Sequence, residues 1–143
     1  METDVRNNSE DAIKHFYEYC LKYKSLVIYG AGDVGRMVAE FMNEKGISFE
    51  CFCVAQKVEN NILEEHEIKE FDEAVCSDGE TAFIVAVSHK SADGILKILA
   101  ERDCSYFYST EFLFQIFKDK CRISASKVHI QNGFIIRIDD IAF

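Results

Sequence analysis

The chain has 143 residues, of which 48% are hydrophobic and 29% charged, which is enough for one globular domain with a core of its own. Its formal net charge of −9 disfavours binding to nucleic-acid phosphates or to an anionic membrane surface. No apolar run approaches the roughly 20 residues of a membrane-spanning helix, and residues 1–10 lack the apolar core of a signal peptide. We therefore expect a cytoplasmic protein that inserts into no membrane and binds no nucleic acid.

The N-terminal segment, residues 1–24, predicts a helix. Ser9 is the expected N-cap, because carboxylates follow it in the first turn. One apolar stripe at helical spacing runs along the segment and is formed by Ile13, Phe16, Tyr17, Cys20 and Leu21.

A strand, a helix and a second strand are predicted next. Residues 25–29 form an apolar run typical of a strand, and residues 34–45 carry a helical pattern with Val34, Val38, Phe41 and Met42 on one face. Gly46 is a natural residue to end this helix. Residues 47–54 are apolar on both faces, as in an interior strand of a parallel sheet.

The middle of the chain is polar and acidic. For residues 56–73 we expect a loop and a short solvated helix. The strongest strand signal follows at residues 81–87, and a helix over 91–102, capped by Ser91, comes next. Residues 105–108 predict a short strand.

The last predicted elements are a helix and a hairpin. Thr110 is the expected cap of a helix that contains Phe112, Leu113, Ile116 and Phe117. Residues 127–138 predict a β-hairpin, because Asn132-Gly133 is the preferred pair of a type I′ turn.

This order of elements predicts an α/β domain with a Rossmann-like parallel sheet and flanking helices, plus the N-terminal helix and the C-terminal hairpin. The chain contains no proline and no linker-like tract. We therefore expect a single domain over residues 1–143, with its α/β core at 25–120. The apolar end at Phe143 is consistent with a fragment of a longer protein.

Cysteine usage predicts neither a disulfide framework nor a metal site. None of the cysteines forms a C-x-x-C pair, and no histidine lies at zinc-finger spacing from them. Cys51 and Cys53 lie two apart in a predicted strand, so both should face one side of it. We expect reduced thiols that serve as small core residues: Cys20, Cys51, Cys53, Cys76, Cys104 and Cys121.

A glycine motif carries the main functional signal. Gly30, Gly32 and Gly35 have the spacing G-x-G-x-x-G directly between a predicted strand and a predicted helix, which is the setting of a dinucleotide fingerprint. There the first glycine permits a tight turn, the second a close approach of pyrophosphate, and the third close packing of helix on strand. The candidate phosphate loop is Gly30, Ala31, Gly32, Asp33, Val34 and Gly35.

The rest of a nucleotide site should lie at the ends of the neighbouring strands. A ribose-binding acid is expected about 20 residues beyond the glycines, but this chain has Gln56 and Lys57 there. Gln56 could bond ribose hydroxyls and Lys57 a phosphate, or both could be solvated loop residues. Ser88 and His89 follow the strongest strand, either as ligand-facing groups or as an exposed turn. No catalytic constellation accompanies them.

The segment from Leu26 to Thr110 resembles the small Rossmann-like domains of bacterial sugar-nucleotide and polysaccharide-biosynthesis proteins. The residues that carry the resemblance are Val27 to Arg36, Gly46 to Phe49, and Phe83 to Ser88. The most similar groups are the N-terminal domains of capsule-type nucleotide-sugar dehydratases and epimerases, and those of sugar acyltransferases. The resemblance implies a phosphate loop under NAD(P) or a UDP-sugar. Many members carry Asp-Asp after the second strand, where this chain has Ala55-Gln56.

Three functions are compatible with these residues. The first is a domain that binds a nucleotide or nucleotide-sugar, in bacterial surface-polysaccharide or sugar-nucleotide metabolism, with little catalysis of its own. The second is a degenerate Rossmann domain used for protein association, as a homo-oligomer or with a fused or partner transferase domain. The third is an NAD(P)-dependent oxidoreductase or epimerase domain, for which 143 residues leave little room beyond the cofactor half.

Overall fold

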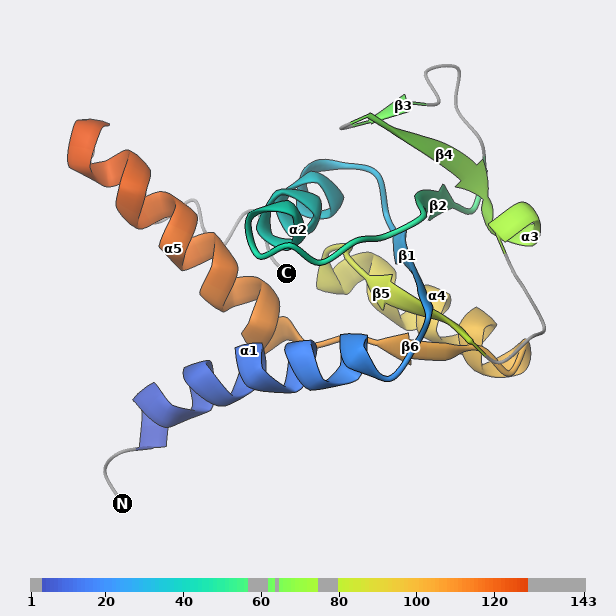
Figure 1. The fold of residues 1–143 in the computed structure, drawn as a ribbon, viewed down its shortest axis with the longest axis horizontal. Helices are drawn as coiled ribbons and strands as arrows, with labels where there is room; N and C mark the ends of the chain where they lie inside the picture. The colour runs from blue at the N-terminus through green and yellow to red at the C-terminus, as the bar shows by residue number, and fades with distance from the viewer. Residues whose placement is uncertain (1–3, 57–61, 64, 75–79, 129–143) are drawn as a thin grey trace.

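The fold is seen in a computed structural model, which describes residues 4–56, 62–63, 65–74 and 80–128. It is a mixed α/β domain (Figure 1). The strands are β1 Ser25–Tyr29, β2 Cys51–Val54, β3 Ile62–Leu63, β4 His66–Glu70, β5 Thr81–Val85 and β6 Ser105–Phe107. The helices are α1 Asp4–Leu21, α2 Asp33–Glu44, α3 Phe71–Ala74, α4 His89–Glu101 and α5 Thr110–Val128.

The strands form one six-stranded sheet in the order β3-β4-β2-β1-β5-β6. All neighbouring pairs are parallel except β3 with β4. In the centre, Val27 of β1 lies opposite Cys51 of β2 on one side and Phe83 of β5 on the other. The chain adds strands on one side of β1 and then crosses to the other side, as in doubly wound folds. The predicted α/β class with a mostly parallel sheet is confirmed.

Helices cover both faces of the sheet, because successive strand residues point to opposite sides. Leu26 and Ile28 of β1 belong to a buried cluster that includes residues of α1, α2 and α5. Val27 and Tyr29 belong to a second cluster that includes residues of α3 and α4. Cys51 and Cys53 are both buried in this second cluster, so the prediction that they share one side of a strand is confirmed.

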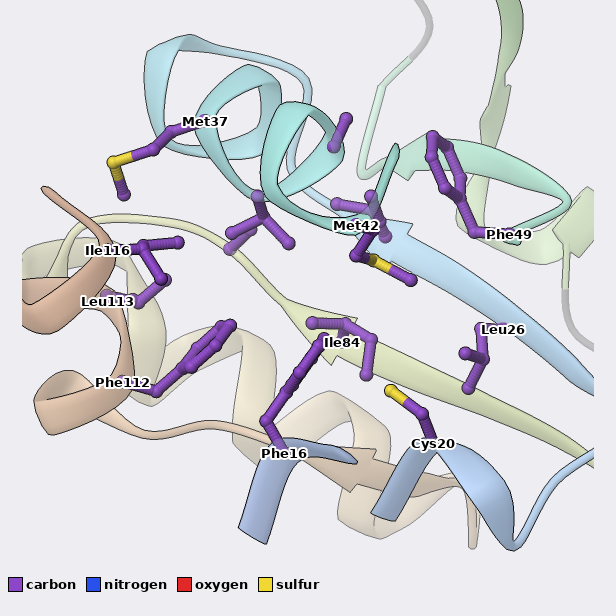
Figure 2. Close-up of a cluster of buried hydrophobic side chains, with 14 of the residues drawn as sticks. Phe16, Cys20, Leu26, Met37, Met42, Phe49, Ile84, Phe112, Leu113 and Ile116 are labelled. Carbon is purple, nitrogen blue, oxygen red and sulfur yellow. The ribbon is translucent and has the colours of Figure 1, made fainter. Parts of the chain in front are cut away.

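Aromatic rings of α1 and α5 pack against each other in the first cluster. The ring of Phe16 stacks on that of Phe112, with centroids 4.2 Å apart and planes 14° from parallel. The same ring meets Phe41 and Phe107 edge-on, at 6.0 and 5.4 Å. Figure 2 shows Phe16 and Phe112 beside each other beneath the strands. Phe16 and Cys20 of the predicted apolar stripe are therefore buried between α5 and the sheet. Leu21 does not belong to this buried face as predicted, because it is the last residue of α1 and is 86% exposed.

Gly46 terminates α2, as the sequence predicts. Gly46 has a φ of +74°, and its N–H donates to the carbonyl of Asn43 at 3.2 Å. The N–H of Ile47 donates to the carbonyl of Met42 at 2.9 Å. This pair of bonds is the Schellman motif, which satisfies the last carbonyls of the helix and favours glycine at position 46.

All three predicted N-caps are wrong. α1 begins at Asp4, so Ser9 lies inside it, because residues 4–8 contain no glycine or proline that would end the helix. Ser88, not Ser91, is the N-cap of α4. Ser109 caps α5 in place of Thr110, because its Oγ accepts a hydrogen bond from the N–H of Phe112 at 3.1 Å.

The acidic middle segment is only partly what the sequence predicts. The expected short helix is present as α3, but its Phe71 and Ala74 are buried and not solvated. In place of the expected loop, residues 66–70 form β4, which pairs with β2 in parallel, Phe52 opposite Ile68. Ile68 is the one buried residue of this strand. A single apolar residue among charges gives no strand pattern, so pairing with β2 decides the structure here.

Other boundaries move by a few residues. β2 begins at Cys51 and not at 47, because the N–H of Ile47 is used in the hydrogen bond to Met42 that ends α2. β5 ends at Val85 and not at 87, and β6 at Phe107 and not at 108. α5 continues through Val128, so residues 127 and 128 are helical and not part of a hairpin strand. The rest of the predicted hairpin lies outside the described residues.

Candidate functional site

Gly30 lies at the carboxyl end of the central strand, held between the two neighbouring strands. Its N–H donates to the carbonyl of Cys53 in β2 at 2.9 Å. On the other side, the N–H of Ala86 donates to the carbonyl of Tyr29 at 2.9 Å. Gly30 has a φ of +125°, and a Cβ there would collide with the carbonyl oxygen of Ala86. The fold itself therefore requires glycine at this position.

Gly35 is required for a different reason. It lies in the first turn of α2, and a Cβ on it would fall on the carbonyl group of Gly30. The missing side chain lets α2 pack directly on the end of β1. This is the role expected for the third glycine of the motif.

Gly32 differs from both. It is the N-cap of α2 with a φ of −94° and a ψ of −151°, an extended conformation open to other residues. A Cβ on Gly32 would meet no atom within 4 Å. Nothing within the described chain requires glycine here. The effect of its missing side chain is an uncovered stretch of backbone at the start of a helix.

The beginning of α2 is polarised for an anion. The N–H groups of Asp33, Val34 and Gly35 lie in its first turn, where a helix offers no acceptor of its own. The positive end of the helix dipole lies at the same point. The exposed carboxylate of Asp33 occupies this turn as well. A bound phosphate would therefore compete with Asp33 for the dipole.

A second helix begins at the neighbouring strand. Ser88 follows the end of β5 and is the N-cap of α4, with an extended backbone and no hydrogen bond from its side chain to the cap. His89 is the first residue of α4 and is exposed. α2 and α4 lie on opposite faces of the sheet. The N-termini of α2 and α4 therefore both lie at the carboxyl ends of the strands, next to β1 and β5, where the strand order reverses.

The remaining predicted residues divide into three groups. Ala31 and Val34 are half-buried and pack against the first core cluster, so their side chains serve the fold. Gln56 is exposed in the bend after β2, at the same sheet edge as the glycine loop. Lys57 lies outside the described residues.

Glu70 is a residue at this edge that sequence reasoning missed. It ends β4 and lies opposite Val54, the last residue of β2. It is half-buried, and its N–H donates to the carboxylate of Glu73 at 3.2 Å. A carboxylate thus stands one strand away from Gln56. No sequence signal could locate it, because β4 itself has no strand pattern.

Two cavities lie away from this edge. One, of about 240 Å³, lies between α2 and α5 and is spanned by an ion pair between Lys120 and Glu40 at 2.8 Å. The other, of about 380 Å³, lies where α1 ends, beside Leu21, Tyr23 and Gly46. Neither includes a residue of the glycine loop.

The buried thiols are poor nucleophiles. Burial raises the pKa of Cys20 to about 12 and raises that of Cys53 as well, first through desolvation and then through its neighbours Cys51 and Cys104. A thiol with a raised pKa is protonated at neutral pH and unreactive. In the described ranges no cluster of three His, Cys, Asp or Glu side chains is arranged to hold a metal ion. No helix there is long and apolar enough to span a membrane.

The comparisons with protein families and with curated proteins add no relative. No protein-family model matches the sequence. The search of curated proteins likewise found no match.

Proposed function

We propose that this chain binds a nucleotide or a nucleotide-sugar at the carboxyl edge of its sheet, with its phosphates against the glycine loop. The observation that carries the proposal is Gly32. Gly30 and Gly35 are explained by packing within the protein, whereas Gly32 has an ordinary backbone conformation and open space around its Cα. A glycine that the fold does not need, at the start of a helix, is what close approach of a pyrophosphate requires.

The neighbouring groups support a ligand that extends along the edge. On the β5 side, Ser88 offers a hydroxyl that makes no cap bond. On the β2 side, Gln56 offers an amide where dinucleotide enzymes usually place an acid. An amide can form hydrogen bonds with sugar hydroxyls, but it lacks the carboxylate that NAD-binding domains usually place on the ribose. We therefore favour a UDP-sugar over NAD(P), in bacterial surface-polysaccharide or sugar-nucleotide metabolism, with little catalysis by the chain itself.

Calorimetric titration tests the proposal directly. The purified chain is titrated with UDP-sugars, NAD(H), NADP(H) and coenzyme A. We expect a UDP-sugar to bind most tightly. If none of them binds at millimolar concentration, the proposal is wrong. Tightest binding of a nicotinamide nucleotide, with turnover, would instead favour the oxidoreductase function.

Two glycine variants connect binding to the loop. Gly32→Ala should fold normally and weaken binding by about tenfold or more, which corresponds to about 1.4 kcal/mol. Gly94→Ala is the matched control, because its Cβ also meets nothing within 4 Å but lies in α4. It should bind like the unmodified chain. If the two variants bind with equal affinity, the glycine loop is not part of the binding site.

A variant that removes a charge should raise the affinity for the ligand instead of lowering it. Asp33→Asn removes the carboxylate that competes with a phosphate for the start of α2. The affinity for an anionic ligand should therefore rise several-fold, and the gain should shrink at high salt because screening weakens the repulsion. Weaker binding of this variant would show that the ligand contacts Asp33 itself.

A further inference from the structure

The edge of the sheet at β6 is open in the described part of the chain. β6 is the last strand of the sheet and pairs with β5 alone, Tyr106 opposite Phe83 (Figure 1). An unpaired strand edge presents backbone N–H and carbonyl groups to any further strand. Soluble proteins usually guard such edges with charges, proline or bulges. The stretch from Cys104 to Ser109 contains no charged residue and no proline. Of the features that protect an edge against pairing with another strand, β6 has only its short length.

Apolar side chains are exposed next to this edge. Tyr106, the central residue of β6, is 37% exposed, and Ile98 of α4 is 39% exposed. α4 contacts β6, so Ile98 lies on the helix next to the strand that carries Tyr106. They account for two of the five large hydrophobic residues that are exposed in the described chain.

Charge decides which occupant fits this edge. The chain carries a net charge of −9, so two copies repel each other over most of their surfaces. The β6 edge is a neutral strip where two copies meet without opposing like charges. An antiparallel pair centred on Tyr106 sets the two Tyr106 residues opposite each other, with only cysteine, serine and aromatic residues across from one another at 104–108. Aromatic cross-strand pairs are favourable.

We propose that two copies of this chain associate through β6, in an antiparallel pairing about a two-fold axis that joins their sheets. Such an interface is isologous, because the same strand serves both copies. Tyr106 and Ile98 form its apolar contacts. The pairing leaves the glycine loop outside the interface, since the loop lies at the carboxyl edge of β1 and not along β6.

Sedimentation equilibrium from low to high micromolar concentration tests the proposal. We expect the unmodified chain to form a concentration-dependent dimer. Tyr106→Lys should raise its dissociation constant by about tenfold or more, because a lysine on each strand guards the edge and the two charges repel. A monomer at every concentration would overturn the proposal.

Matched variants separate the edge from general surface effects. Phe114→Lys changes a residue of α5 that is 42% exposed, and it should leave the dimer unchanged. Ile98→Lys lies on the proposed surface but outside the strand, so it keeps the test valid if Tyr106→Lys does not fold. Dimers that both the Tyr106 and Ile98 variants retain would place the interface elsewhere and refute the proposal.

Discussion

Gly35 lies directly against the carbonyl group of Gly30, so closely that a single methyl group on Gly35 would overlap it. The contact joins the first turn of α2 to the end of the central strand. It positions the open backbone at Gly32 at the edge of the sheet where β1 and β5 end. Two glycines thus hold the loop, and the third leaves it uncovered.

Gly35→Ala should destabilise the fold. Its Cβ would push α2 away from β1, and such overpacking costs roughly 1–3 kcal/mol. Gly94→Ala should instead stabilise it by roughly 0.5–1 kcal/mol, because an exposed helical glycine gains helix propensity at no steric cost. Urea denaturation of both variants measures the difference. Equal stability of Gly35→Ala and the unmodified chain would contradict the contact.

Phe16→Ala should remove the main contact between α1 and α5. Phe16 is fully buried, and truncating such a ring costs about 3–5 kcal/mol. Phe114→Ala is the control, since that ring is 42% exposed and surface changes usually stay within about 0.5 kcal/mol. Thermal and urea unfolding followed by circular dichroism compare the two. A small effect at Phe16 would mean that α1 contributes little to the core.

Tyr108→Phe should stabilise the protein by about 1 kcal/mol, because a buried hydroxyl without a partner bears an uncompensated desolvation cost. The Tyr108 hydroxyl is buried and meets no hydrogen-bond partner among the described residues. Burial, and secondarily Asp93, raises the pKa of this hydroxyl. Tyr106→Phe, at an exposed ring, should change the free energy of unfolding little. A loss of stability in Tyr108→Phe would reveal a bond to the hydroxyl in solution.

The buried thiol of Cys20 should make stability fall at alkaline pH. Its pKa is raised by desolvation from 9.0 to about 12, so the unfolded chain releases this proton first as the pH rises. The contribution of the neutral thiol is therefore complete below pH 9.0 and is lost progressively towards pH 12. Urea denaturation across this range should show a shallower decline in Cys20→Ala. Parallel pH profiles would show that the thiol is not protected in the fold.

The sequence predicted the helices and strands correctly where apolar residues recur at helical or strand spacing. It failed where contacts between distant segments determine the secondary structure. The strands around Ile28 and Ile84, and the helix through Val38 and Met42, follow from their apolar periodicity. β4 could not be predicted, because Ile68 is its single buried residue and the strand depends on pairing with β2. The predicted N-caps of α4 and α5 failed for a related reason, since two nearby hydroxyl residues could cap each helix, Ser88 or Ser91 in α4 and Ser109 or Thr110 in α5.

The candidate site divides in the same way. The spacing of Gly30, Gly32 and Gly35 predicted the loop and its place between strand and helix, because the backbone conformation of a tight turn is local. Which glycine serves the fold and which is left open could not be read from that spacing. That depends on Ala86 and on the carbonyl of Gly30, atoms brought to the loop by β5 and by the packing of α2.

The sequence by itself determined the α/β class, the glycine turn and the apolar faces of the main helices, since these depend on residues near one another in the chain. Only the tertiary structure decided that β4 joins the sheet with Glu70 beside the end of β2, that the start of α4 meets the glycine loop at one edge, and that β6 is left open among the described strands. The physical reason is that strand pairing joins distant segments, and its energy comes from contacts that local residue patterns do not contain.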